Sequence, residues 1–355
     1  MMRKYYSLRK LASYGLAASL TSIIVGQAQR VQAINLKFDY TYDTNDFFND
    51  TRKATLEEAA TYFEPLTDNL DAITDEDSNL TDIGATGAYY DTGEVDGEGN
   101  PIYEEIINTW TANFDHPSVN DFTQTIDNLT VAEDTLKIYV GAKNLSSLGQ
   151  GGPGGFGASG LGDFVNTVKA RGQTGALETT PTDFGTWGGS ISFDNNLTSG
   201  WSWNDNFEDP LEEYEYDFLS VAIHEIGHLM GVGTTSSWTT NVSGTEFIGP
   251  KSVQTYGSNV PLTSDGGHWA EGTQSYVNGA SQEAAMDPTI NSVNNLGQRK
   301  VFTDLDYAGL ADVGWQTEAV SAQVPFEFSP GMGIVLVSGI FGAKKGLQEL
   351  KKRKN

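Results

Sequence analysis

The sequence predicts an α+β domain with two lobes, in which a twisted mixed sheet and one strongly apolar helix precede an irregular C-terminal lobe. Two observations support this class. Three segments, at residues 34–40, 135–141 and 187–194, carry the residue patterns of β-strands. Helical patterns cover residues 218–230 and 307–313, downstream of those strands. A mature domain of about 285 residues is long enough to bury such a core.

The elements are expected in the following order. A first strand covers 34–40, where apolar and polar residues alternate, and a helix covers 51–66. Between the strands at 135–141 and 187–194, the stretch 149–162 is rich in glycine but lacks the strand-then-helix setting of a phosphate-binding loop, so we expect a flexible surface loop. Thr303 and Asp306 have the spacing of a capping box that opens the helix 307–313, and Gly314 closes it.

The apolar helix contains the pattern His-Glu-x-x-His. Its apolar positions recur at helical spacing, so His224 and His228 lie on one face, about 6 Å apart along the axis. That face can hold two imidazoles on one Zn2+, each at roughly 2.0–2.1 Å. Glu225 follows the first histidine, where its carboxylate can reach a zinc-activated water and act as general base.

The alternative interpretation is an ordinary amphipathic helix with two solvated histidines. Two histidines in a strongly apolar helix are costly unless something binds them, which favours a zinc site. Gly231 stands where a helix stops in a left-handed turn, as the chain must if it is to fold back with a further ligand. Histidines are also scarce, because the whole chain has only His116, His224, His228 and His268.

The segment from His224 to Gly231 resembles the metzincin clan of zinc endopeptidases. The clan's extended pattern places a third histidine three residues after the glycine, where this chain has Thr234, and a hydroxyl is a poor zinc ligand. Leishmanolysin-like metzincins insert a long segment before the third histidine, and the methionine of the Met-turn follows it. This resemblance implies that His268 is the third ligand and Met286 the Met-turn residue.

Other assignments stay open at this point. Imidazole is a better zinc ligand than a lone carboxylate where two histidines are already present, which favours His268. Met286 alternatively fills a gap in the core, as most methionines do. The resemblance covers residues 190–315 by motif and residues 34–190 only by the order of elements. It also implies that the strand at 187–194 is the edge strand of the sheet, along which an extended substrate lies. The competing third ligands are Asp265, Glu271, Glu246 and His116.

Both ends of the chain carry targeting patterns. Residues 1–33 combine a basic start, a mostly small and apolar stretch at 11–28 and small residues before Ile34, which predicts a secretory signal peptide cleaved after Ala33. A retained N-terminal anchor is the alternative. These patterns divide the chain into a signal peptide at 1–33, a zinc metallopeptidase domain at 34–318 and a C-terminal sorting or anchor tail at 319–355.

The tail has three parts, namely Pro-Phe-Glu at 325–327, an apolar run at 331–343 and a basic cluster from Lys344 onward. It resembles the PEP-CTERM class of bacterial sorting signals, which implies processing by an exosortase. The apolar run is shorter than the ~20 residues of a stable membrane span. A plain amphipathic anchor or a short retained span is the alternative. Whether the tail is a sorting signal or an anchor, it predicts that the protein is exported and lies in the envelope, on the cell surface or outside a bacterium.

The net charge of the predicted mature chain restricts the kinds of molecule that it can bind. Residues 34–343 hold ten basic and 46 acidic side chains, a formal net charge of −36. Such a chain is repelled by nucleic acid and by anionic membranes, and it favours basic or neutral substrates and divalent cations. The stretch 91–100 offers oxygen ligands for Ca2+ but lacks the spacing of a helix-loop-helix calcium site, so a solvated acidic turn is favoured. The chain has no cysteine, which excludes disulfides, a lipid-anchored cysteine and a thiolate that would silence the zinc.

The sequence therefore predicts a secreted, monomeric zinc endopeptidase that acts on peptides or proteins, with Glu225 as general base and zinc on His224, His228 and His268. Membrane contact is expected only through the signal peptide and the tail. Two alternatives remain at this point. One is a non-catalytic, acidic, calcium-binding surface protein with a vestigial zinc site, and the other is a zinc hydrolase acting on a non-peptide bond.

Overall fold

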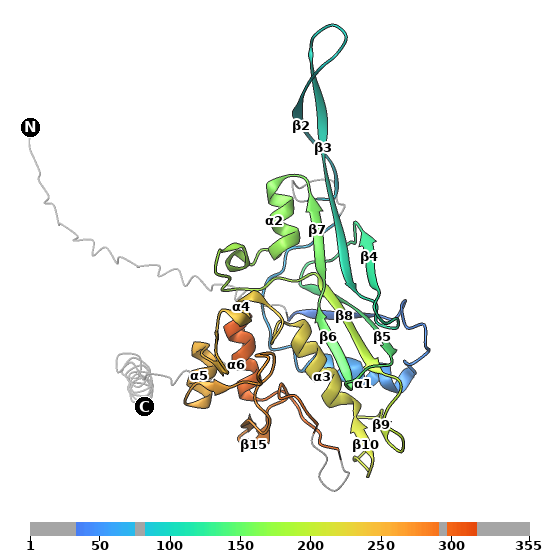
Figure 1. Ribbon diagram of the computed structural model, residues 1–355, viewed down its shortest axis with the longest axis vertical. Coiled ribbons are helices and arrows are strands. Elements are labelled where there is room, and N and C mark those ends of the chain that lie inside the picture. The colour runs from blue at the N-terminus through green and yellow to red at the C-terminus, as the bar shows by residue number, and fades with distance from the viewer. Residues whose placement is uncertain (1–32, 75–81, 291–296, 318–355) are drawn as a thin grey trace, which may run out of the picture. The chain divides into compact units, whose positions relative to one another are not determined.

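The computed structural model describes residues 33–74, 82–290 and 297–317, which form a mixed α+β fold with several sheets (Figure 1). The predicted α+β class is therefore confirmed. Apart from Ala33, the predicted signal peptide and tail lie outside the described residues. In the described part of the chain, no helix is both long and apolar enough to cross a membrane. The helices are α1 (Asp50–Thr61), α2 (Gly162–Ala170), α3 (Phe218–Leu229), α4 (Ser236–Thr239), α5 (Pro250–Tyr256), α6 (Asp304–Val313) and the 3-10 helix η1 (Thr174–Leu177).

The main sheet has four strands in the order β1-β5-β8-β6. Strands β1 (Asn35–Asp39), β5 (Thr135–Lys143) and β8 (Gly188–Asp194) are parallel, and they lie where the sequence predicts strands. Strand β6 (Gly149–Pro153) runs antiparallel to β8 and forms the edge. The expectation that the strand at 187–194 is the edge is therefore wrong, because β8 is paired on both sides.

The expectation of a flexible loop over 149–162 is also wrong. This stretch forms β6 and β7 (Gly155–Ser159), and β7 pairs with β3. Several of its glycines serve close packing, because a Cβ on Gly154 would overlap the indole of Trp187 and a Cβ on Gly155 would overlap the side chain of Asn113. Glycine allows such close approach as readily as it allows flexibility, and only the packing distinguishes the two.

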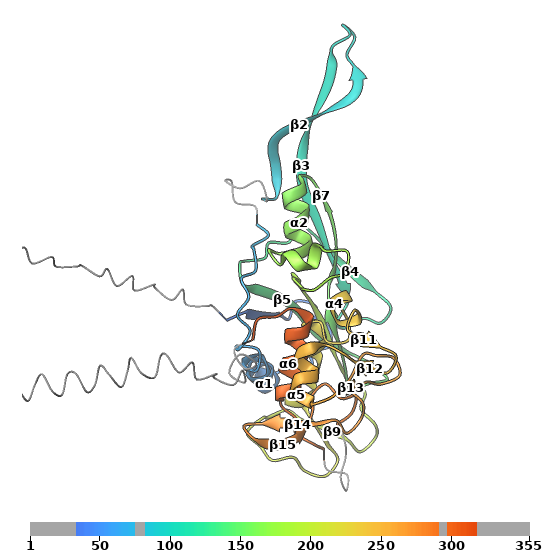
Figure 2. The same ribbon diagram turned by 90° about the vertical axis from the view of Figure 1, so that its left-hand side faces the viewer.

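A second sheet contains β2 (Gly84–Val95), β3 (Pro101–Asp115) and β4 (Thr123–Asp127), with β7 beside β3. Strands β2 and β3 form a long hairpin that projects from the sheet in both views (Figures 1 and 2). The acidic stretch at 91–100 lies at the tip of this hairpin. There the Asp96 carboxylate accepts hydrogen bonds from the backbone N–H groups of Glu98 and Asn100, at 2.8 and 2.9 Å.

Helix α3 lies in the centre of the core, against β6, β8 and α1. Ten of its twelve residues are buried, so the helix is enclosed on nearly all sides. Each fully buried large apolar side chain contributes about 1.5–3 kcal/mol to stability. Asp217 caps the helix by accepting from the backbone N–H of Ser220 at 3.1 Å, and Arg299 holds the Asp217 carboxylate at 2.7 Å. After the helix, Gly231 has a φ of 108°, a backbone conformation that residues with a Cβ rarely adopt. This confirms the predicted turn at the end of the helix.

Helix α1 is shorter than the predicted 51–66, because it ends at Thr61. The cause is Pro65, four residues later. A proline in a helix has no N–H to donate, and its ring would clash with the carbonyl four residues earlier, which is that of Thr61. Residues 62–66 turn instead, and the buried Leu66 pairs with Thr317.

The chain after α3 consists of short elements. A small sheet joins β11 (Val242–Ser243), β12 (Glu246–Phe247) and β13 (Val260–Pro261), and a hairpin joins β14 (Gln274–Val277) and β15 (Ala280–Glu283). Before α3, β9 (Ser202–Asn204) pairs with β10 (Glu215–Asp217). Helix α6 begins with the predicted capping box, in which Thr303 and Asp306 exchange hydrogen bonds.

Candidate metal centre

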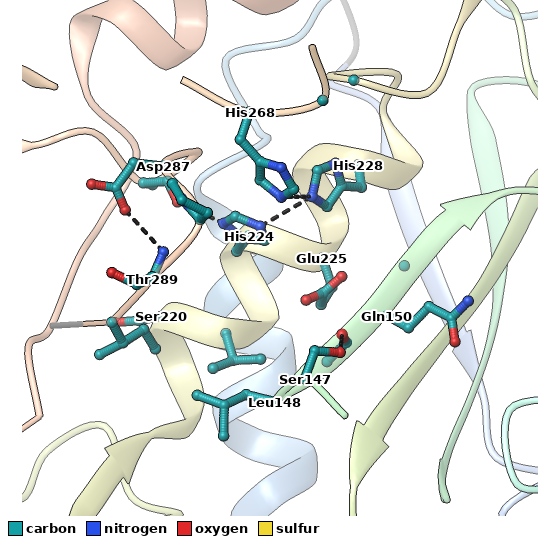
Figure 3. A pocket seen from close by; sticks show the side chains of 18 of the residues that line it. Ser147, Leu148, Gln150, Ser220, His224, Glu225, His228, His268, Asp287 and Thr289 are labelled. Carbon is teal, nitrogen blue, oxygen red and sulfur yellow. Dashed lines mark hydrogen bonds between the residues drawn. The ribbon is translucent and has the colours of Figure 1, made fainter. Parts of the chain in front are cut away.

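Three histidines predicted as ligands meet at one point (Figure 3). The Nε2 atom of His228 lies 3.0 Å from Nε2 of His224 and 3.0 Å from Nε2 of His268. Nitrogen ligands at roughly 2.0–2.1 Å from a tetrahedral zinc are about 3.3 Å apart. Two of the three spacings are close to this value, and ligand atoms of all three histidines lie within 4.8 Å of one another, so the cluster could hold one metal ion.

The tautomers of the helix histidines favour a cation there. The Nδ1 atom of His224 lies 2.7 Å from the carbonyl oxygen of Ala285, and that of His228 lies 2.8 Å from the carbonyl oxygen of Val232. A carbonyl can only accept, so each Nδ1 carries the hydrogen and each Nε2 presents a lone pair. Two lone pairs at 3.0 Å repel each other unless a cation lies between them.

The same environment keeps the imidazoles neutral, which is the form that binds metal. Burial and the neighbouring His228 and His268 hold the pKa of His224 well below its usual value. Burial and His268 lower the pKa of His228 to about 4. Burial also lowers the pKa of His268, against the effect of Asp265.

His268 reaches the helix because the chain between α3 and this histidine folds back on itself. Gly233 has a φ of 73°, and a Cβ there would collide with the backbone of Gly267. The indole N–H of Trp238 donates to the carbonyl of Gly266 at 2.9 Å, which fixes the loop from the α4 side. The 231–268 segment therefore delivers the third imidazole to the other two.

The alternative ligands have other partners. The Thr234 hydroxyl donates to the carbonyl of His228 at 2.7 Å, so it caps the end of α3. His116 accepts from the backbone N–H of Ser118 at 3.1 Å. None of the competing residues joins the histidine cluster in the described ranges. Glu246 accepts from Asn259, Glu271 from Thr289, and Asp265 from Thr263 and Gly267.

Glu225 lies beside the histidines, between α3 and β6, and lines the same cavity (Figure 3). Burial raises the pKa of its carboxyl to about 8, and the backbone N–H of Gly151 opposes this shift by donating to the carboxylate. The cavity has a volume of about 770 Å3, and its walls include Ser147, Leu148, Tyr216 and Thr289. A potential base and a potential metal site therefore share one cavity.

Met286, which the sequence predicts as either a Met-turn residue or a core residue, packs against α3. It is fully buried, and a Cβ on Gly227 would overlap its sulfur. The preceding residue, Ala285, supplies the carbonyl that holds His224. The turn therefore contacts the helix between the two histidines and orients one of them.

Sequence reasoning identified Asp306 only as a helix cap and missed its larger role. Its carboxylate also accepts from the backbone N–H groups of Ala285 and Met286, at 2.9 and 3.2 Å, and from the indole of Trp269 at 2.9 Å. It thus joins α6, the Met-turn and the residue after His268. No local pattern distinguishes this aspartate from an ordinary capping residue.

A buried charged cluster in one wall of the cavity was also missed. The Lys300 ammonium contacts Asp287 at 2.6 Å, Glu283 at 3.0 Å and the carbonyl of Thr289 at 2.6 Å. Burial raises the pKa of Asp287 to about 7, against the effect of Lys300. These residues are distant in sequence from α3, so no sequence motif indicated that they would line the same cavity as the histidines.

Comparison with protein-family models, with curated proteins and with solved structures finds no match to this chain. The resemblance to metzincins therefore rests on the residues of the motif alone.

Proposed function

We propose that the protein is a secreted zinc endopeptidase of the metzincin type, leishmanolysin-like in its late third histidine. One observation carries the proposal. Three imidazole Nε2 atoms converge in a cavity that also holds a buried glutamate next to the first histidine in sequence. Three protein ligands with a fourth position open to the cavity are typical of catalytic zinc.

The roles of the residues follow from this arrangement. His224, His228 and His268 would hold the ion, which supplies activation of water and polarisation of the scissile carbonyl. Glu225 accepts the proton of the attacking water and delivers it to the leaving amine.

Strand β6, rather than β8, is the edge along which we propose that the substrate binds. It pairs with β8 on one side only, antiparallel, from Gly149 opposite Phe193 to Pro153 opposite Gly189. An edge strand has unpaired N–H and C=O groups to which an extended peptide can add as a further strand. The side chain of Gln150 points away from the histidines, which leaves the backbone of β6 accessible to a peptide (Figure 3).

A peptide substrate explains more of the site than the alternatives do. The cavity lies beside a free strand edge, which suits a peptide backbone better than a non-peptide bond. The histidine triad also supports a complete site, because His268 can supply the imidazole that Thr234 does not. The acidic domain favours basic or neutral substrates. Export, a bacterial envelope location and a monomeric state remain parts of this proposal.

The direct test uses the purified mature protein with neutral and basic fluorogenic peptides and zinc analysis. The wild type should carry about one zinc and cleave these peptides, and Glu225→Gln should lose activity yet keep the zinc. His116→Ala is the matched control and should keep both. A wild type that binds zinc tightly but cleaves no peptide would overturn the proposal in favour of a non-catalytic site. Zinc lost together with activity in Glu225→Gln would make Glu225 a ligand instead.

A further inference from the structure

The glycines of β6 lie directly against the proposed general base. A Cβ on Gly149 would lie 2.5 Å from Oε1 of Glu225, 2.7 Å from Cγ and 2.8 Å from Cδ. A Cβ on Gly151 would overlap the backbone carbonyl of Glu225. Strand β6 therefore contacts both the side chain and the main chain of this residue.

These glycines are required for space and not for backbone conformation. Neither has a φ in the left-handed region, so an alanine could adopt the same backbone. Gly157 of the neighbouring β7 provides the contrast, because a Cβ there would meet nothing within 4 Å. The glycine-dense stretch thus contains two positions, Gly149 and Gly151, that exclude a methyl group because of Glu225, and one, Gly157, that does not.

The position of the Glu225 carboxylate depends on this packing. The backbone N–H of Gly151, in the same strand, is directed at the carboxylate and stabilises its charged form. A residue held by backbone packing moves when the backbone moves. The same strand is the edge along which we propose that the peptide binds, so β6 contacts the base and borders the proposed substrate site.

We infer that Gly149 is a positioning residue for Glu225, and that the absence of a side chain at this position holds the base in register with a substrate bound on the edge of β6. The inference rests on the proposed peptidase function. It makes Gly149 a residue that acts through Glu225 and touches no reacting atom itself.

The kinetic test compares Gly149→Ala with Gly157→Ala in the zinc-loaded mature protein. A misplacement of about 1 Å costs roughly 100-fold in rate, so Gly149→Ala should lower kcat by about 10- to 100-fold. Its KM should stay within about threefold and its zinc content near one. Gly157→Ala should match the wild type. An increase in KM with unchanged kcat would overturn the inference, because the strand would then act on substrate binding alone. Equal kinetics for the two variants would also overturn it.

A second measurement needs no activity. In the zinc-free protein, Gly149→Ala should lower the midpoint of thermal unfolding, and the decrease should disappear when Glu225→Ala removes the atoms that the new methyl group meets. The same decrease in both backgrounds would contradict the contact with Glu225. A wild type without peptidase activity would refute the proposed function, and this unfolding cycle would still decide the contact.

Discussion

Asp306 offers a sharp test of how the fold supports the metal centre. Its carboxylate is fully buried and accepts five hydrogen bonds, from Thr303 N–H, Thr303 Oγ1, Ala285 N–H, Met286 N–H and Trp269 Nε1. Asp306→Asn preserves the shape of the side chain but replaces one acceptor oxygen with an amide that donates. The amide then faces at least two of these donors.

The magnitude follows from the number of bonds lost. If the asparagine oxygen faces Thr303 and Ala285, the N–H groups of Met286 and Trp269 lose their acceptor inside the core. Each buried donor without an acceptor costs about 1–3 kcal/mol. Removal of a buried charge offsets part of this cost, since burial already raises the pKa of Asp306. We expect a loss of about 3 kcal/mol, or roughly 6–12 °C in Tm for a domain of this size.

The assay is thermal unfolding of the zinc-free mature protein, followed by zinc affinity with a competing chelator. Asp304→Asn is the matched control, because it makes the same change in the first turn of the same helix, where a half-buried acid contributes about 1 kcal/mol or less through the helix dipole. Zinc affinity in Asp306→Asn should fall about tenfold, because Ala285 also orients His224. Equal Tm values for the two variants would refute the role of Asp306 in holding the Met-turn.

Three further outcomes are expected. His268→Ala should weaken zinc binding by about two orders of magnitude or more and abolish peptidase activity, whereas Thr234→Ala and His116→Ala should keep both; full zinc in His268→Ala after mild chelation would contradict the ligand set. Burial raises the pKa of Asp68 to about 7, so the folded state holds this proton more tightly than the unfolded state and stability falls as pH rises from about 4 to 7. The free energy of unfolding of Asp68→Asn, measured with urea, should therefore rise by a few kcal/mol relative to that of the wild type between pH 5 and pH 8. A constant difference between the two proteins across this range would contradict the raised pKa of Asp68. If residues 325–355 are a sorting signal, mass spectrometry of the exported protein should find no basic C-terminus, and an intact C-terminus would instead indicate a retained anchor.

Local patterns were sufficient for the elements whose geometry is local. A separation of four residues places His224 and His228 on one helical face whatever surrounds the helix, and Glu225 follows from its neighbour. The capping box of Thr303 and Asp306 is likewise a contact between residues three apart. The strands at 34–40, 135–141 and 187–194 were visible because each carries its own pattern.

The third imidazole was predictable only with help from resemblance. Composition left His268 in competition with several carboxylates and His116, because ligand chemistry restricts residue types but does not bring together residues forty positions apart. The fold of the 231–268 segment, with left-handed glycines at 231 and 233, placed the histidine.

The order of strands and the meaning of the glycine-dense stretch were decided by tertiary structure alone. A strand pattern shows that a segment is extended but not which neighbours it pairs with, so β8 was mistaken for the edge and β6 for a loop. Glycine is equally suited to a mobile loop and to a place where backbones touch. Only the close contact between β6 and Glu225 shows which applies here, because that contact joins residues more than seventy positions apart and no local pattern encodes it.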